Sequence, residues 1–390
     1  MAKIIQAAII IGVCFSMNTT GKGNEYIRLN ARINNQPVLL AFDTGADGPA
    51  LFRKAARRLG IKVREPRADF QPKPGNVKVG VTNECLVEFG EVAWHLKFAV
   101  IDLPGFIRSE LDGVIGWGTI SQNIVEISHA PNKFKFHDKL IIDRSLWRCY
   151  KIRSDLDSLV MQIPKKQGDF VHVLIDTGSY SGVKLRPEIW RQLVDSDNKK
   201  LTLSALFTPG KGVVVSEETW AQRLVLEGII FREVPVSKGV QAGEGSFEGG
   251  PDVILGLHAL SCFSWIIDGS TGHIYLKPNN LTRIPEKYSY NRLGAVFVHR
   301  DIETSDSLVA HVVKPGPAYS AGIRDGDILL GINDVDATKW RTDPSVMPLS
   351  RFWDQPAGTE LTLELMRDSK KREVSVTLKE IFKDNKQDRP

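Results

Sequence analysis

The sequence predicts a mainly β chain with two related β-rich units and a smaller third unit. Three observations predict this architecture. The 33 glycines and 20 prolines among 390 residues indicate the many turns that connect short strands. The tripeptide Asp-Thr-Gly occurs twice, at 43–45 and at 176–178, and each copy ends an apolar run. Beyond residue 290 the order of apolar and turn residues changes, which indicates a different kind of unit.

Each Asp-Thr-Gly copy is unusual because its carboxylate directly follows a strand-like apolar run. Ala41-Phe42 precedes the first copy, and Leu174-Ile175 precedes the second. An acidic side chain at the end of a buried strand needs partners that offset its loss of hydration. Thr and Gly then allow a tight turn with a hydroxyl available for hydrogen bonding. We therefore expect each copy to be a buried strand that delivers one carboxylate and then turns.

The first unit is predicted to span 24–140 and to consist of short strands with one helix. The expected strands lie at 25–33, 37–42, 77–81, 85–103, 111–118 and 124–127, and the helix lies at 51–59. Within this unit, the apolar element Val114-Ile115-Gly116 places its glycine 73 residues after Asp43.

The second unit is predicted to span 142–277 and repeats the same order of elements. A strand at 170–175 leads into the second tripeptide, and a helix at 187–194, a turn at 208–212, a strand at 213–215 and a hairpin at 224–236 follow. The apolar element Ile254-Leu255-Gly256 places its glycine 80 residues after Asp176. Because a whole series of elements recurs, we interpret the chain as an internal duplication of one β-rich unit.

A linker rich in Pro and Asn is predicted at 278–290, and the third unit at 291–382. Its expected elements are a strand at 308–313, a helix that opens within 316–322, a strand within 326–330 and a closing hairpin at 361–378.

The first 16 residues are predicted to be a signal peptide or a membrane anchor. Lys3 precedes an apolar run at 4–15 that is short for a bilayer span but typical of a secretory signal. We therefore expect a periplasmic or secreted protein, with anchoring through the N-terminus as the alternative. Three of the four cysteines remain after such a segment is removed, so at most one intramolecular disulfide is expected.

The composition excludes several classes of function. A net charge of +5, from 51 basic and 46 acidic residues, is too small to indicate nucleic-acid binding. The widely spaced cysteines and histidines do not form a metal-binding pattern, so we expect neither a metal nor another cofactor.

Two carboxylates on equivalent turns can meet across an approximate twofold axis. At about 3 Å apart they cannot both ionise easily, so they share one proton. The ionised member then activates a water molecule, and the protonated member donates to the carbonyl oxygen of the bond to be cleaved. Thr44 and Thr177 are expected to bond to the backbone of the opposite unit. Gly45 and Gly178 are expected to let that backbone approach the carboxylates closely.

The paired motifs resemble those of aspartic proteases with two lobes in one chain, of the pepsin or retropepsin type. The resemblance covers residues from about 25 to 276 and implies two pseudo-twofold-related acid-protease β-barrel lobes. It implies a catalytic dyad of Asp43 and Asp176, which hydrolyses peptide bonds of polypeptide substrates in a monomeric catalytic unit. The implied supporting residues are Thr44, Gly45, Thr177, Gly178 and Ser179.

The sequence departs from this family in two respects. Ala46 stands where Ser or Thr is common, whereas Ser179 keeps the usual residue in the second lobe, so Asp43 is expected to have the less supported environment. Residues 77–81 and 210–215 are candidates for a flap by position only, and neither contains a tyrosine.

The third unit resembles a PDZ domain, a β-sandwich-like fold with short helices. The segment Leu293-Gly294-Ala295-Val296 matches the carboxylate-binding loop, and the segments at 315–322 and 326–333 match the remainder of the pattern. The resemblance implies that this loop binds peptide C-termini or that the domain binds extended peptides.

Two alternatives stay open at the level of sequence. The chain is either an aspartic endopeptidase or a catalytically inactive peptide-binding scaffold with a protease fold, and the two intact aspartates favour the enzyme. Asp112 and Asp252 also precede apolar elements that end in glycine, and for these we expect a structural role as turn or cap residues.

Overall fold

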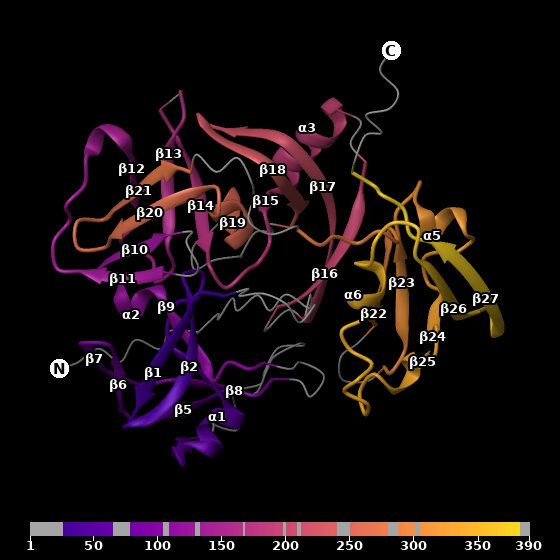
Figure 1. Cartoon of the computed structure of the whole chain (residues 1–390), viewed down its shortest axis with the longest axis horizontal. Helices are drawn as coiled ribbons and strands as arrows, with labels where there is room; N and C mark the ends of the chain where they lie inside the picture. The colour runs from indigo at the N-terminus through magenta and orange to yellow at the C-terminus, as the bar shows by residue number, and fades with distance from the viewer. Residues whose placement is uncertain are drawn as a thin grey trace.

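The computed structural model describes residues 26–64, 79–103, 109–128, 133–166, 168–197, 200–208, 212–239, 250–279, 288–300 and 305–382. The predicted signal or anchor at 1–16 lies outside these residues, as does most of the predicted linker. In Figure 1 the first half of the chain lies below the second half, and the C-terminal domain lies beside the second half. The chain is mainly β, which confirms the predicted fold class.

The first half forms a nine-stranded sheet in the order β4-β5-β8-β3-β9-β2-β1-β6-β7. Its strands are β1 (Arg28–Ile33), β2 (Gln36–Asp43), β3 (Ala50–Phe52), β4 (Val63–Arg64), β5 (Val79–Thr82), β6 (Cys85–Phe89), β7 (Val92–Leu96), β8 (Ala99–Ile101) and β9 (Gly113–Gly116). β9 is buried along its whole length, so its apolar run reads as a central strand.

The second sheet has twelve strands in the order β11-β10-β20-β21-β12-β13-β14-β19-β15-β18-β17-β16. Its strands are β10 (Ile124–Ser128), β11 (Lys133–His137), β12 (Arg148–Ile152), β13 (Val160–Pro164), β14 (Phe170–Asp176), β15 (Val183–Leu185), β16 (Thr202–Thr208), β17 (Gly212–Leu226), β18 (Ile229–Lys238), β19 (Val253–Gly256), β20 (Phe263–Asp268) and β21 (His273–Pro278). β16 therefore forms one edge of this sheet.

The two halves repeat one pairing pattern. β2 runs parallel to β9 as β14 runs parallel to β19. β3 pairs with β9 and β8 with the same polarities as β15 with β19 and β18. The hairpin β4–β5 occupies the place in the first half that the hairpin β16–β17 occupies in the second. The duplication expected from the sequence is thus present in the strand pairing.

One part of the first half pairs with the second. β10 is antiparallel to β20, with Ile124 opposite Asp268 and Ile127 opposite Trp265. β11 continues the same sheet through β10. The sheet of the second half therefore includes residues from the predicted first unit.

The helices are short. They are α1 (Arg53–Arg58), α2 (Trp117–Ile120), α3 (Pro187–Asp197), α4 (Leu257–Leu260), α5 (Pro317–Ser320) and α6 (Ser350–Trp353), with 3₁₀ turns at Arg144–Leu146 and Ala337–Lys339. The helix predicted at 51–59 is wrong at its start, because Leu51 and Phe52 belong to β3. That strand pairs with both β8 and β9, so sheet hydrogen bonds override the local helical pattern.

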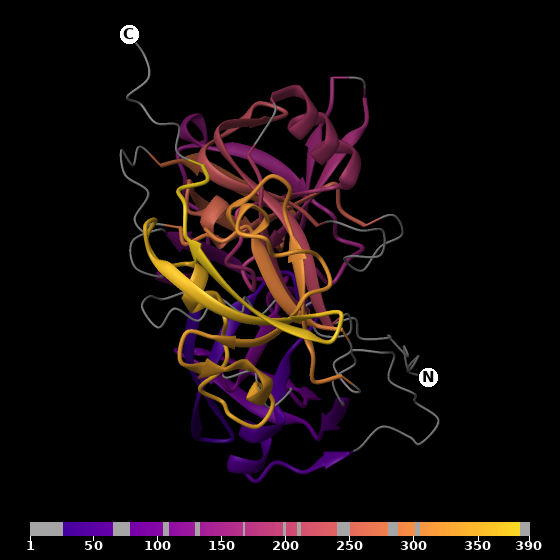
Figure 2. The ribbon, with the colours of Figure 1, turned by 90° about the vertical axis from the view of Figure 1, so that its right-hand side faces the viewer.

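The C-terminal domain is built on a third sheet in the order β22-β23-β24-β26-β27, with β25 paired to β24. Its strands are β22 (Ala295–His299), β23 (Leu308–Val312), β24 (Ile328–Ile332), β25 (Val335–Asp336), β26 (Glu360–Arg367) and β27 (Lys370–Thr377). Its buried core includes Leu203 from β16 of the second half. Figure 2, viewed from the side of this domain, shows it lying over the outer strands of the second half.

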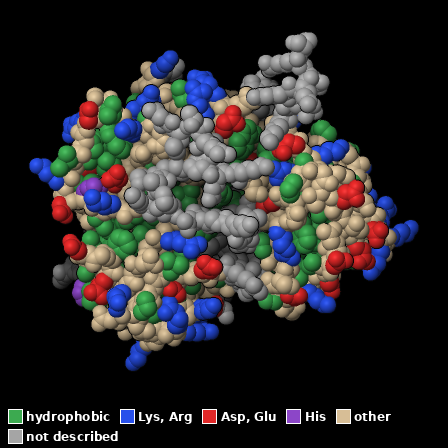
Figure 3. Space-filling model, in the orientation of Figure 1, with side chains coloured by type: hydrophobic (Ala, Val, Ile, Leu, Met, Phe, Trp, Pro, Cys, Tyr) green, Lys and Arg blue, Asp and Glu red, His purple; other side chains and the backbone are tan. Residues whose placement is uncertain are grey.

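The outer surface is mixed in charge. Figure 3 shows Lys and Arg side chains interspersed with Asp and Glu on the face drawn. Within the part of the chain that the structure describes, no helix combines the length and apolar character that a bilayer crossing requires. Cys85, Cys149 and Cys262 are all free thiols.

Candidate functional site

The two Asp-Thr-Gly turns meet at the junction between the halves. β2 ends at Asp43 and β14 ends at Asp176, and each aspartate is almost completely buried. Asp43 lies opposite Gly116 of β9, and Asp176 lies opposite Gly256 of β19. The prediction that each tripeptide ends a buried strand with a carboxylate is therefore confirmed.

The glycines that end β9 and β19 let each turn fold back onto the strand behind it. A Cβ on Gly116 would lie 2.5 Å from the carbonyl oxygen of Ala46, and one on Gly256 would lie 2.3 Å from that of Ser181. Such distances are impossible for real side chains, so both positions require glycine.

The two threonines join the halves through reciprocal hydrogen bonds. The Thr44 hydroxyl donates to the carbonyl oxygen of Ile175 at 2.5 Å, and the Thr177 hydroxyl donates to that of Phe42 at 2.7 Å. Each hydroxyl also accepts from the backbone N–H of the other threonine, at 3.0 Å for Thr177 Oγ1 and 3.2 Å for Thr44 Oγ1. These bonds to the opposite backbone are the ones that the sequence predicts.

Each carboxylate lies against the glycine of the opposite turn. A Cβ on Gly178 would lie 2.3 Å from Asp43 Oδ2, and one on Gly45 would lie 2.9 Å from Asp176 Oδ1. The structure therefore brings Asp43, Asp176, Gly45 and Gly178 together around one point, with both carboxylates facing it.

Burial dominates the electrostatics of this pair. Burial raises the pKa of Asp43 well above its usual value, and the neighbouring charge of Asp176 raises that pKa further. The N–H groups of Gly45, Ala46 and Gly178 act in the opposite direction without offsetting the burial. A shared proton is the state that such an environment favours.

The Ala46 turn and the Ser179 turn differ less than the sequence predicts. Asp43 Oδ1 accepts hydrogen bonds from the N–H of Gly45 at 3.0 Å and of Ala46 at 3.2 Å. The Ser179 hydroxyl lies 2.8 Å from the Ser181 hydroxyl, so it is engaged within its own turn. The backbone gives Asp43 support that an alanine side chain cannot give.

A second carboxylate pair flanks the first turn and has no signal in the sequence. Burial and the charge of Asp157 raise the pKa of Asp47 to about 6. Leu159 N–H donates to the carbonyl oxygen of Thr44 at 3.0 Å, which brings this segment of the second half under the first turn. Asp157 lies in an ordinary polar turn segment, so nothing in its local sequence predicts this contact.

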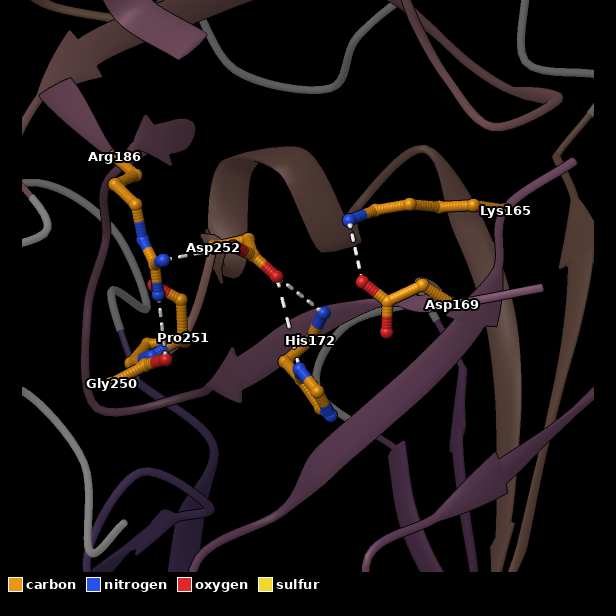
Figure 4. A network of polar contacts seen from close by, with 7 residues as sticks. All are labelled: Lys165, Asp169, His172, Arg186, Gly250, Pro251 and Asp252. Carbon is orange, nitrogen blue, oxygen red and sulfur yellow. Dashed lines mark hydrogen bonds and ion pairs between the residues drawn. The ribbon is translucent and has the colours of Figure 1, made fainter. Parts of the chain in front are cut away.

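Asp112 and Asp252 have the same structural role in the two halves. Asp252 Oδ2 accepts from the N–H of His172 at 2.9 Å and pairs with Arg186 at 3.3 Å, as Figure 4 shows. Asp112 likewise accepts from Leu39 N–H at 2.9 Å and pairs with an arginine side chain. The structural role is as predicted, but each side chain bridges two strands and does not cap a turn.

The candidate flap segments fall on the two equivalent hairpins. Residues 77–78 and 210–211 lie outside the described residues, whereas 79–81 belong to β5 and 212–215 belong to β17. β5 pairs with β4, and β17 pairs with β16.

An aromatic cluster links the second turn to the C-terminal domain. Tyr180, four residues after Asp176, stacks on Tyr288 with ring centroids 6.1 Å apart. Trp220 contacts Tyr288 and stacks on Phe382 near the end of the chain. Sequence reasoning missed this cluster because its members come from four distant segments.

The PDZ-like loop is in place but its N–H groups are already bonded. The N–H groups of Leu293 and Gly294 donate to Asn291 Oδ1 at 2.9 and 3.2 Å. Gly294 has a φ of 71°, which favours glycine at this position. Ala295 and Val296 are buried at the start of β22.

Comparison with protein families agrees with both resemblances. The aspartyl protease family model matches residues 29–119, and the PDZ domain model matches residues 292–378. The chain therefore contains an aspartyl protease domain and a C-terminal PDZ domain. The first match includes the Asp43 turn and Gly116 but ends before the Asp176 turn. A comparison with curated proteins gave no match.

Proposed function

We propose that the chain is an aspartic endopeptidase that hydrolyses peptide bonds with a shared-proton dyad of Asp43 and Asp176. The observation that carries this proposal is the position of each carboxylate against the glycine of the opposite turn. One carboxylate activates a water molecule, which attacks the peptide carbonyl without a covalent enzyme intermediate. The other carboxylate donates to the carbonyl oxygen, and the proton then returns to the leaving nitrogen.

The environment favours Asp43 as the member that holds the proton before attack. Its pKa is raised by burial and by Asp176. Its Oδ2 atom is buried and makes no hydrogen bond with any residue that the structure describes. Titration nevertheless belongs to the pair, since the two groups interact strongly. Both aspartates come from one chain, so we propose a monomeric catalytic unit.

A catalytically inactive peptide-binding scaffold is the alternative. Two buried carboxylates that face each other carry a large desolvation cost. A scaffold has no use for that cost, whereas a shared-proton mechanism depends on it. The intact pair therefore favours the enzyme.

The test is cleavage of an unfolded polypeptide by the full chain and by Asp43→Asn and Asp176→Asn. Each substitution keeps the side-chain shape but removes proton exchange, so we expect each to lower kcat by roughly 10³-fold. A statine-type inhibitor is expected to block the wild type. Asp112→Asn is the matched control, because Asp112 precedes the equivalent apolar strand and serves it structurally. Full activity in either dyad variant, with circular dichroism unchanged, contradicts the shared-proton mechanism.

We also propose that residues 1–16 direct export, as a cleaved signal or as a membrane anchor. The support is the cationic start and the apolar run. Mass spectrometry of the N-terminus of the mature protein, together with fractionation of the cell, distinguishes a cleaved signal from an anchor and from a cytosolic chain.

A further inference from the structure

The edge of the PDZ sheet is the starting point. β22 is the outermost strand of that sheet, with β23 as its only ladder partner. A peptide ligand joins a PDZ domain by lying along such an edge, between the strand and a helix. In this chain the corresponding groove lies between β22 and α6.

The groove is covered by the hairpin β16–β17 of the protease half. Leu203 of β16 is buried in the core of the PDZ domain, and Ala205, Val213 and Val215 pack against the same core. The cavity that remains is lined by residues of β16, β22 and α6 and measures about 50 Å³. Pockets that hold peptide-sized ligands are typically about 300 Å³ or larger, so the groove has no room for a second strand.

Polar contacts hold β16 at the same place. The Thr202 hydroxyl donates to the carbonyl oxygen of Asn291 at 2.6 Å. Asn291 Nδ2 donates to the carbonyl oxygens of Leu203 at 3.0 Å and of Ala295 at 2.8 Å. One side chain thus joins the protease strand to the first residue of β22.

The same asparagine occupies the loop that is expected to read a peptide carboxylate. Asn291 Oδ1 accepts from both Leu293 and Gly294 N–H, as described above. An incoming C-terminal carboxylate must displace this buried amide and break its bonds to β16 as well. The loop is therefore built to stabilise the covered groove.

We propose that the ligand of this PDZ domain is an internal strand of the same chain, β16, and that the domain does not read free peptide C-termini. The side chain of Leu203 is the apolar anchor, and Asn291 takes the place of a terminal carboxylate. The domain thereby holds the hairpin β16–β17, which is the counterpart of the hairpin β4–β5 in the first half. This inference concerns docking alone and does not depend on catalysis.

The test compares the full-length wild type with Leu203→Glu and with a control, Val225→Glu. Val225 lies on β17 but is 46% exposed and outside the interface. A glutamate at Leu203 cannot be buried in the apolar core without a partner, so it should release β16. Hydrogen exchange is measured at 295–299 and 349–353, and we expect exchange at least tenfold faster in Leu203→Glu alone.

The opened groove is then probed with a fluorescent, amidated peptide that copies residues 200–208. Fluorescence anisotropy should show binding at least tenfold tighter to Leu203→Glu than to the wild type or the control. The same peptide with a free C-terminal carboxylate should bind within about threefold of the amidated form.

Three results overturn the proposal. They are unchanged exchange in a folded Leu203→Glu protein, no peptide binding to an opened groove, and a free carboxylate that tightens binding tenfold or more. Where Leu203→Glu does not fold, Thr202→Val provides the same readouts. It removes one interface hydrogen bond and should increase exchange at 295–299 about threefold, whereas no change counts against the proposal.

Discussion

The two halves build the same active-site turn but surround it differently. In the first half, the hairpin β4–β5 ends the nine-stranded sheet. In the second half, the equivalent hairpin β16–β17 is packed into the core of the PDZ domain. The Asp176 turn is also joined to that domain through Tyr180 and Tyr288. The chemistry is therefore symmetric at the junction, whereas control by another domain can act only through the second half.

The largest expected effect comes from adding a methyl group to each active-site glycine. The Cβ of Gly178→Ala would overlap Asp43 at 2.3 to 2.6 Å, whereas that of Gly45→Ala would approach Asp176 at 2.9 Å. A displaced catalytic group costs roughly 10²-fold in rate per ångström. We therefore expect kcat to fall about 100-fold for Gly178→Ala and about 10-fold for Gly45→Ala.

Gly48→Ala is the matched control for these glycines. It lies in the same loop, and a Cβ there would meet no atom within 4 Å. Its activity should stay within about twofold of the wild type. Equal losses for Gly45→Ala and Gly178→Ala would show that the two turns are equivalent after all.

The next effect concerns pH and the interface on the second half alone. Burial, assisted by the charge of Asp354, raises the pKa of Glu218 on β17 to about 7, although the Tyr288 hydroxyl and Lys184 act in the opposite direction. Burial likewise raises the pKa of Asp354 to about 7, against the opposing effect of Arg292.

A raised carboxyl pKa means that the folded state holds the proton more tightly than the unfolded chain does. This stabilisation is complete below about pH 4.5 and is lost as the pH rises through 7. For Glu218 the loss amounts to about 3 kcal/mol at most. Glu218→Gln should flatten the dependence of the thermal midpoint on pH, and the exposed neighbour variant Glu217→Gln should leave it unchanged. An unchanged pH profile in Glu218→Gln would remove the interface from the comparison.

The smallest effect tests the symmetric part. Thr44→Val and Thr177→Val each leave a buried carbonyl oxygen and an N–H group without their partners, which should cost about 2 kcal/mol in the free energy of unfolding. Because the bonds are reciprocal, the two losses should be equal, and the double variant should lose less than their sum. Urea unfolding measures them, with the exposed Thr342→Val as the control. Clearly unequal losses would extend the asymmetry to the junction itself.

The sequence predicts the active-site turns well because their signal is local. An apolar run before Asp-Thr-Gly and a later apolar element ending in glycine define strands that must be buried and must approach closely. The positions of Asp43, Asp176, Gly116 and Gly256 follow from that pattern. Their catalytic role remains a prediction.

Contacts between distant segments explain what the sequence does not predict. Asn291 lies before the PDZ loop as an ordinary turn residue, and only the docking of β16 gives its side chain five hydrogen-bond contacts. Leu203 has the pattern of any edge-strand residue, so its burial in another domain has no local signal. The start of α1 was missed for the same reason, since the pairing of β3 with β8 is not encoded nearby.

The pairing of β10 with β20 has a consequence for how the protein folds and for how a duplicated gene can diverge. Residues 124–137 leave the half in which they are encoded and complete the sheet of the other half. A chain cut after residue 140 would carry two strands whose backbone groups lack their ladder. Such a fragment could satisfy them only by exchange with another copy. Both halves should therefore melt in a single cooperative transition, and neither can be inherited as a self-sufficient module.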